Sequence, residues 1–167
     1  MAYRNKVFVS FDGDNDMHYY RLMRAWKQSD NTQFDFYDAH ELCQSRDSSL
    51  EETIKRSLRN RLVNSKTFVL LIGEHTRYLF KFVRWEMEQA LSLDLPFIAV
   101  NLNQIRRQDI ERCPPLIRDS LAVHISFNAR IMQFALENWP TSHENLKRQY
   151  KSGPYYYDDS VYNSLGL

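Results

Sequence analysis

The sequence has few of the residues that mark several large classes of protein. Only four of its 167 residues are glycine, and its cysteines are limited to Cys43 and Cys113. Two cysteines cannot form a disulfide framework, so we expect a reduced, intracellular and cytoplasmic protein. No apolar run approaches the roughly 20 residues that a membrane-spanning helix needs, so no membrane association is expected. A strand-like segment follows the first residues at once and leaves no room for a signal peptide.

An excess of charge of one sign is also missing. The chain has 22 basic and 21 acidic residues, a formal net charge of +1. Non-specific binding to nucleic acid normally accompanies a surplus of positive charge, so no nucleic-acid partner is expected. The five histidines show none of the spacings typical of metal ligands. The acidic residues Asp12, Asp14 and Asp16 lack the glycine and distal glutamate of a calcium loop, so we expect no metal site.

The motifs of the common nucleotide cofactors and hydrolases are absent as well. No G-x-G-x-x-G follows the first apolar segment, and no P-loop pattern of glycines with Lys-Ser or Lys-Thr is present. The G-x-S-x-G elbow of the serine hydrolases is absent too. We therefore expect no bound cofactor.

The chain does contain a regular alternation of short apolar runs and helical stripes. Strands are predicted over residues 6–11, 34–38, 67–72, 96–102 and 121–127. Helices are predicted after Asp16 and along apolar stripes that begin at Leu50, Val83 and Ile131. Alternating strands and helices predict an α/β fold with a doubly wound, mostly parallel sheet and helices on both faces. We find no internal repeat and no second domain.

Capping and breaking residues predict where several elements begin and end. Ser48 and Glu51 are three residues apart and predict a capping box at the start of the second helix. Pro140 is predicted to end the helix that begins at Ile131. From Lys151 onward the chain is predicted to form an irregular tail rich in tyrosine.

The loops that follow the first and third strands are the predicted place for a ligand. Open parallel sheets bind ligands beyond the carboxyl ends of their strands, which directs attention to residues 11–16 and 73–82. On the following helix, Glu86 falls at the edge of the apolar stripe, and two roles are open: a catalytic carboxylate, or an ordinary helix glutamate. Trp85 is predicted to point away from the core, as a binding surface or beneath the C-terminal tail.

Several of these segments resemble one protein family. The run VFVSF at residues 7–11, followed by an acidic turn, looks like the first strand of TIR and TIR-like domains. LLIGEHT at residues 70–76 and FVRWEM at residues 82–87 resemble the signature of the TIR-like ThsB proteins of bacterial Thoeris anti-phage systems. The resemblance covers about residues 6–102. It implies a flavodoxin-like fold, with residues 1–150 as a single TIR-like domain and residues 151–167 as a tail.

The resemblance also implies an activity and the residues that carry it. Proteins of this family use NAD⁺ as a substrate, split the bond between nicotinamide and ribose, and make a cyclic ADP-ribose-type signal. That diffusible signal activates a separate effector protein. The catalytic glutamate of the family falls here at Glu86, and the acidic residue of the first loop maps to Asp16, which we assign first to capping the helix and second to binding ribose.

Other predicted substrate contacts surround this glutamate. Phe11 and Phe82 are expected to form an aromatic wall that excludes water and stacks on a ring. Thr76 belongs to the quoted signature and is included among the binding residues. The acidic first loop disfavours phosphate, so the diphosphate is expected to lie away from it, toward one of three arginines: Arg46, Arg77 or Arg84.

A second interpretation stays open at this point. The chain is alternatively a non-catalytic TIR-like interaction module, in which Trp85 and the aromatic residues of the tail bind a protein partner. Release of free nicotinamide from NAD⁺ separates the two interpretations. The sequence does not specify the trigger, which a phage would supply, or the oligomeric state.

Overall fold

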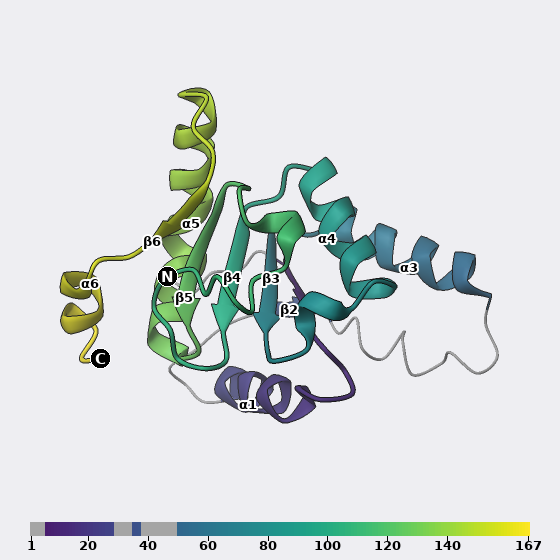
Figure 1. The fold of residues 1–167 in the computed structure, drawn as a ribbon, viewed down its shortest axis with the longest axis horizontal. Coiled ribbons are helices and arrows are strands. Elements are labelled where there is room, and N and C mark those ends of the chain that lie inside the picture. The colour runs from purple at the N-terminus through teal and green to yellow at the C-terminus, as the bar shows by residue number, and fades with distance from the viewer. Residues whose placement is uncertain (1–5, 29–34, 38–49) are drawn as a thin grey trace.

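A six-stranded, fully parallel sheet forms the centre of the molecule (Figure 1). The computed structural model describes residues 6–28, 35–37 and 50–167. The strands lie in the order β2-β1-β3-β4-β5-β6. Their bounds are β1 (Lys6–Ser10), β2 (Asp35–Tyr37), β3 (Thr67–Ile72), β4 (Phe97–Asn101), β5 (Ala122–Ser126) and β6 (Pro154–Tyr156). The helices are α1 (Met17–Gln28), α3 (Glu51–Val63), α4 (Phe82–Ser92), α5 (Ala129–Arg148) and α6 (Asp159–Ser164), with short 3₁₀ turns η2 (Thr76–Tyr78) and η3 (Pro115–Ile117).

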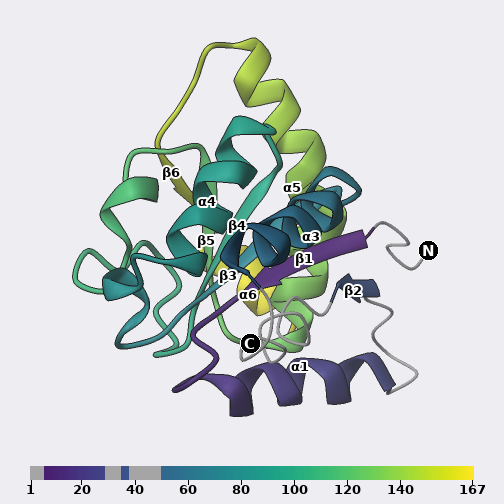
Figure 2. The same ribbon diagram turned by 90° about the vertical axis from the view of Figure 1, so that its right-hand side faces the viewer.

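Two layers of helices cover the two faces of the sheet (Figure 2). Alternate residues of each strand point to opposite faces: Val69 and Leu71 of β3 belong to one apolar cluster, and Leu70 to the other. The first cluster includes side chains of α1, α5 and α6. The second includes side chains of α3, α4 and η3. Because helices cover both faces, the fold is the doubly wound, flavodoxin-like α/β architecture that the sequence predicts.

The three central strands confirm the predicted parallel arrangement. In the register of the sheet, Phe8 of β1 is paired with Phe68 of β3, which in turn is paired with Phe97 of β4. Their rings form a continuous row, with centroids 5.6 Å apart for the first pair and 4.7 Å for the second. Aromatic neighbours on adjacent strands stabilise a sheet beyond their area of burial. This row fixes β1, β3 and β4 as neighbours, so the loops that follow β1 and β3 leave the same edge.

Two predicted helix boundaries are wrong. Helix α3 begins at Glu51 with Leu50 at the N-cap position and no side-chain cap, so no capping box forms; Ser48 itself lies outside the described residues. Helix α5 continues through Pro140 to Arg148. Trp139 and His143, on either side of this proline, are both buried. Packing of the continuing apolar face against the sheet therefore outweighs the hydrogen bond that the proline removes.

The prediction of an irregular C-terminal tail is also wrong. β6 adds a sixth parallel strand beside β5, with Tyr155 paired to Val123, and α6 follows it. Tyr162 of α6 is fully buried in the apolar cluster of α1 and α5. Its hydroxyl accepts a hydrogen bond of 3.2 Å from the backbone N–H of Ser126 at the end of β5. The sequence signals of a loop, among them the Gly-Pro pair, mark only the entry to β6.

Within the described residues, none of the helices is both long enough and apolar enough to cross a membrane. The same residues contain no group of three or more histidine, cysteine or acidic side chains arranged to hold a metal ion.

Candidate functional site

Glu86 is a buried carboxylate at the carboxyl edge of the sheet. It lies in the second turn of α4, and its side chain is only 3% exposed. Ser10, the last residue of β1, donates a short hydrogen bond from its hydroxyl to Oε2 of Glu86. Ser10 is itself 1% exposed. Glu86, which the sequence places at the edge of the apolar stripe of α4, therefore turns inward, and its carboxylate is held against β1.

Replacing Ser10 tests this contact. A hydrogen bond to a charged group contributes about 1.5–3 kcal/mol. We expect Ser10→Ala to lower the free energy of unfolding by an amount in that range, measured by urea denaturation, because the buried carboxylate loses a donor. Ser120→Ala, which removes a half-exposed hydroxyl from a loop, is the matched control with little expected effect. Equal stability of Ser10→Ala and the unchanged protein would contradict the contact.

The loop after β1 is organised by Asp12. Its Oδ1 accepts hydrogen bonds from the backbone N–H groups of Asp14 (3.0 Å) and Asn15 (3.3 Å), and its Oδ2 accepts one from the Asn15 amide at 2.7 Å. The N–H of Asp16 is bonded to the backbone carbonyl of Asp12 at 2.9 Å. An aspartate that binds N–H groups two and three residues ahead is an ordinary turn-forming residue. Asp12 therefore orders the turn, while Asp16 directly precedes α1 and its carbonyl accepts hydrogen bonds from the N–H groups of Tyr19 (3.1 Å) and Tyr20 (3.4 Å).

Asp16 lies between this loop and β3. The residue is 7% exposed, and its Oδ2 has no hydrogen-bond partner. Its carboxylate lies directly over Gly73, the first residue after β3: a Cβ atom at position 73 would come within 2.1 Å of Oδ2. Burial raises the pKa of Asp16, and the negative charge of Asp12 raises it further, while nearby positive groups such as Arg112 act in the opposite direction. Gly73 is thus required for this packing rather than for an unusual backbone angle.

The raised pKa of Asp16 gives a pH-dependent prediction. A carboxyl group whose pKa is higher in the folded state binds protons more readily there, so stability falls as pH rises from the unfolded pKa through the folded one. Asp16→Asn removes this loss. We therefore expect the variant to be more stable than the unchanged protein at pH 7, with the difference shrinking as pH falls toward 3.8. Urea denaturation across this range tests it, and a variant less stable at pH 7 would contradict the account.

Thr76 shapes the loop after β3 from inside the protein. It is 1% exposed. Its hydroxyl oxygen accepts a hydrogen bond of 2.9 Å from the N–H of Gly73 and lies 3.4 Å from the carbonyl of Leu71, to which it donates. The threonine of the quoted signature therefore holds Gly73 in the position that accommodates Asp16. It acts on the site through the backbone.

The two predicted wall aromatics lie in the two cores. Phe11 is 8% exposed and stacks on Tyr20 of α1, with ring centroids 4.6 Å apart. Phe82 is also 8% exposed and belongs to the cluster of α3 and α4, with the ammonium group of Lys81 over its ring. The structure thus places these rings in the interior on opposite faces of the sheet, where they support the two loops.

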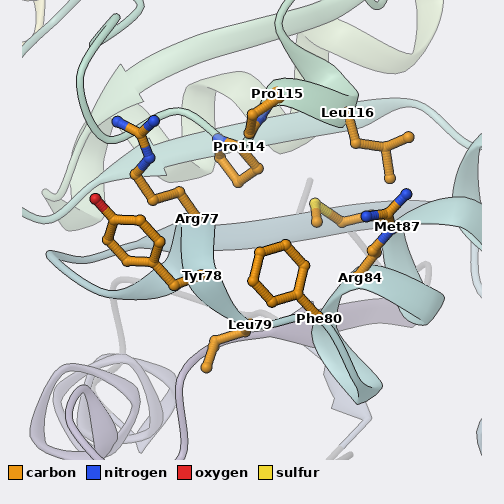
Figure 3. Close-up of a pocket in the computed structure, with 9 residues that line it drawn as sticks. All are labelled: Arg77, Tyr78, Leu79, Phe80, Arg84, Met87, Pro114, Pro115 and Leu116. Carbon is orange, nitrogen blue, oxygen red and sulfur yellow. The ribbon is translucent and has the colours of Figure 1, made fainter.

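Arg77 and Arg84 line a cavity of about 410 Å³ on the η3 side of α4 (Figure 3). The cavity is bounded by the segment from η2 to α4 and by Pro114–Leu116, and the loop after β1 does not line it. Glu86 points toward β1, whereas Arg84 and Met87 on the same helix face the cavity. Arg46 lies outside the described residues. Arg77 and Arg84 therefore share a cavity that neither Asp16 nor Ser10 lines.

Neither predicted role of Trp85 fits its position. The ring is partly buried against the cluster of α3 and α4, and Lys55 of α3 lies over it at 5.8 Å. Helix α3 lies beside α4 and covers this flank, which a helical wheel of α4 alone cannot show. The C-terminal segment instead packs at β5. The prediction that Trp85 points away from the core, onto an open surface or beneath the tail, is therefore wrong.

Ser10 and Gly73 are the site residues to which sequence reasoning gave no role. Both carried a usable signal: Ser10, at the carboxyl end of β1, is the only polar residue of that strand apart from Lys6 at its start, and Gly73 is one of only four glycines. A polar residue buried at a strand end needs a hydrogen-bond partner, and a glycine without a turn around it indicates close approach of another group. Neither signal identifies the partner.

A doubly wound parallel domain with buried carboxylates at its carboxyl edge, here Asp12, Asp16 and Glu86, belongs to the class of α/β proteins whose ligands bind at that edge. A comparison with known families identifies one family within this class. Residues 8–107 match the family model described as Thoeris protein ThsB, TIR-like domain. The matched segment is more than half of the chain and contains the end of β1 together with β3, α4 and β4. The chain belongs to the ThsB TIR-like family and is a Thoeris-type defence protein.

Proposed function

We propose that this protein is an enzyme that consumes NAD⁺ by breaking the bond between nicotinamide and ribose. The observation that carries the proposal is Glu86, a carboxylate buried at the carboxyl edge of the sheet and held by Ser10 of the neighbouring strand. Buried charge is costly to a fold and is concentrated at functional sites. Membership of a family of TIR-like defence proteins supports the same assignment.

The chemistry follows from what this carboxylate can stabilise. When the bond from ribose C1′ to nicotinamide breaks, its electron pair leaves with the nicotinamide, which departs as a neutral molecule, and positive charge develops on the ribose. The carboxylate of Glu86 stabilises that charge. Ser10 orients the carboxylate through its hydrogen bond and is a positioning residue. No proton donor is needed for departure, since the leaving group is neutral.

The second half of the reaction determines the product. Capture of C1′ by a hydroxyl of the same ADP-ribose forms a new C–O bond, releases one proton and gives a cyclic product; capture by water gives ADP-ribose. Exclusion of water favours the cyclic product. We propose that the product is a cyclic ADP-ribose-type signal that activates a separate effector, and that a phage-derived trigger switches the enzyme on. The protein uses NAD⁺ as a substrate and needs no resident cofactor.

Asp16 is assigned to the ribose side of this site. Its Oδ2 has no protein partner, a condition that a ribose hydroxyl would relieve by donating a hydrogen bond. The positive charge of Arg112 acts on Asp16. We therefore assign Arg112 to the diphosphate, in addition to Arg46, which the sequence predicts for the same role. Asp16→Asn is then expected to reduce turnover while it raises stability.

The test is direct. Purified protein is incubated with NAD⁺, alone and with lysate of phage-infected cells, and nicotinamide and the nucleotide product are followed by liquid chromatography and mass spectrometry. Release of nicotinamide together with a product of the mass of ADP-ribose less one water supports the proposal. Intact NAD⁺ under both conditions, with saturable capture of a protein partner, would favour the interaction module.

A further inference from the structure

The cavity beside α4 is separate from the edge that carries Glu86. One wall is the segment from η2 to α4, and the other is Pro114–Leu116 at η3, which packs on α4. Glu86 is bonded to Ser10 of β1, while Met87, the next residue, lines the cavity. In the sheet, β1 and β4 lie on opposite sides of β3. The two regions therefore use different sides of the same helix.

The walls of this cavity combine apolar surface with positive charge. Its volume of about 410 Å³ lies within the range of small-molecule sites, about 300–1,000 Å³. Two arginines, Arg77 and Arg84, line it, and no acidic residue does. Figure 3 shows them at opposite ends of the cavity, with aromatic, aliphatic and proline side chains between them. This arrangement is complementary to a ligand that has an apolar part and a negatively charged group.

The rim of the cavity favours a flat ring as that apolar body. Phe80 is 70% exposed and Tyr78 is 58% exposed, although both are large and apolar. Neighbouring exposed aromatic residues beside a cavity are a frequent sign of a binding site. Because every nucleobase has a π-face, an aromatic side chain can stack on any of them. The opposite wall, Pro114 and Pro115, is conformationally stiff and would lose little entropy on binding.

Existing contacts hold both arginines near the cavity. The Nε of Arg84 donates to Oε1 of Glu88 at 3.0 Å, an exposed i,i+4 pair that contributes little to stability. A guanidinium nitrogen of Arg77 donates to the backbone carbonyl of Glu111. Each guanidinium has five N–H donors, so both keep donors for a further anion. Glu88 competes with that anion for Arg84.

We propose that this cavity is a second ligand site, distinct from the NAD⁺ site, that binds an aromatic anion of the size of a mononucleotide. The phosphate or equivalent group contacts Arg84 or Arg77, and the ring stacks at Phe80 and Tyr78. A ligand there would contact Met87, so it would be placed to influence the helix that carries Glu86.

Titration with adenosine 5′-monophosphate tests the site. We expect saturable shifts of the ¹³C-methyl resonances of Met87 and Leu116, with no shift of Met23, a buried residue of α1. Adenosine, which lacks the phosphate, is expected to bind about tenfold more weakly, because a charge-assisted hydrogen bond is lost. Shifts that are absent, or equal for the two compounds, would overturn the proposal.

Three variants sharpen the test. Arg84→Ala is expected to weaken binding of the monophosphate about tenfold. Glu88→Gln is expected to strengthen it severalfold, a gain that misfolding cannot produce. Arg59→Ala, a matched control whose guanidinium contacts Gln89 on α4 outside the cavity, is expected to have no effect. Binding that is indifferent to both Arg84→Ala and Glu88→Gln would overturn the assignment. These measurements involve no turnover of NAD⁺, so failure here leaves the role of Glu86 untouched, and the reverse also holds.

Discussion

Glu86→Gln is expected to lower the rate of nicotinamide release from NAD⁺ by a factor of about 10² or more. The substitution keeps the size of the side chain, and the amide oxygen still accepts the hydrogen bond from Ser10. It removes the negative charge that would stabilise the developing positive charge on ribose. Loss of one preorganised electrostatic group typically costs 10²–10³ in turnover. The measurement is the initial rate of nicotinamide release under activating conditions.

The control for this experiment is Glu88→Gln. Glu88 lies two residues further along α4, is exposed, and forms a surface ion pair with Arg84. A loss of activity caused by the total charge of α4 would appear in both variants, whereas a loss caused by the buried carboxylate would appear only in Glu86→Gln. Near-full activity of Glu86→Gln, with unchanged far-UV circular dichroism, would show that the carboxylate is not catalytic. Equal loss in both variants would show that a general electrostatic effect is responsible.

Tyr162→Ala is expected to lower the free energy of unfolding by about 3–5 kcal/mol, the usual cost of truncating a buried aromatic side chain. Tyr162 is fully buried among α1, α5 and the sheet. The guanidinium of Arg106 also lies over its ring at 4.3 Å. Such a loss is a large fraction of the stability of a domain of this size. Urea denaturation gives the value directly.

Two further variants test the cause of that loss. Tyr162→Phe removes only the hydroxyl that accepts from Ser126, so we expect about 1 kcal/mol. Tyr150→Ala, at a position that is 97% exposed, should change stability by less than about 0.5 kcal/mol. If Tyr162→Ala behaved like Tyr150→Ala, the C-terminal segment would not be part of the core.

The sequence predicted the centre of the fold well because local pattern and tertiary environment agree there. The continuous apolar run of β3 requires cover on both faces, and the structure provides it. The prediction failed where long-range packing overrides a local signal. Pro140 lies inside α5 because the apolar face continues past it, and the segment after Lys151 folds because Tyr162 fills a place in the core. A single-sequence pattern does not contain either contact.

For the candidate site, the sequence indicated the carboxyl edge of the sheet and placed Glu86 at the border of the apolar stripe of its helix, and the structure buries this side chain. The edge follows from parallel topology, and the position of Glu86 follows from the helical period. The partner of Glu86 could not be predicted, because Ser10 lies 76 residues away in the chain. Arg77 and Arg84 were predicted from their charge alone, away from the acidic loop. The cavity that they line together with Pro114–Leu116 could not be predicted, because it depends on contacts between segments far apart in the chain.

The close packing of Gly73 and Asp16 also limits how this protein can change during evolution. Any side chain at position 73 would place its Cβ within 2.7 Å of three atoms of the Asp16 carboxyl group. Asp16 is short and buried, so it has little room to turn away. A lineage could acquire alanine at position 73 only after, or together with, a smaller residue at position 16. The two positions, 57 residues apart in the chain, would then be inherited as a pair, and loss of the acid would come before loss of the glycine.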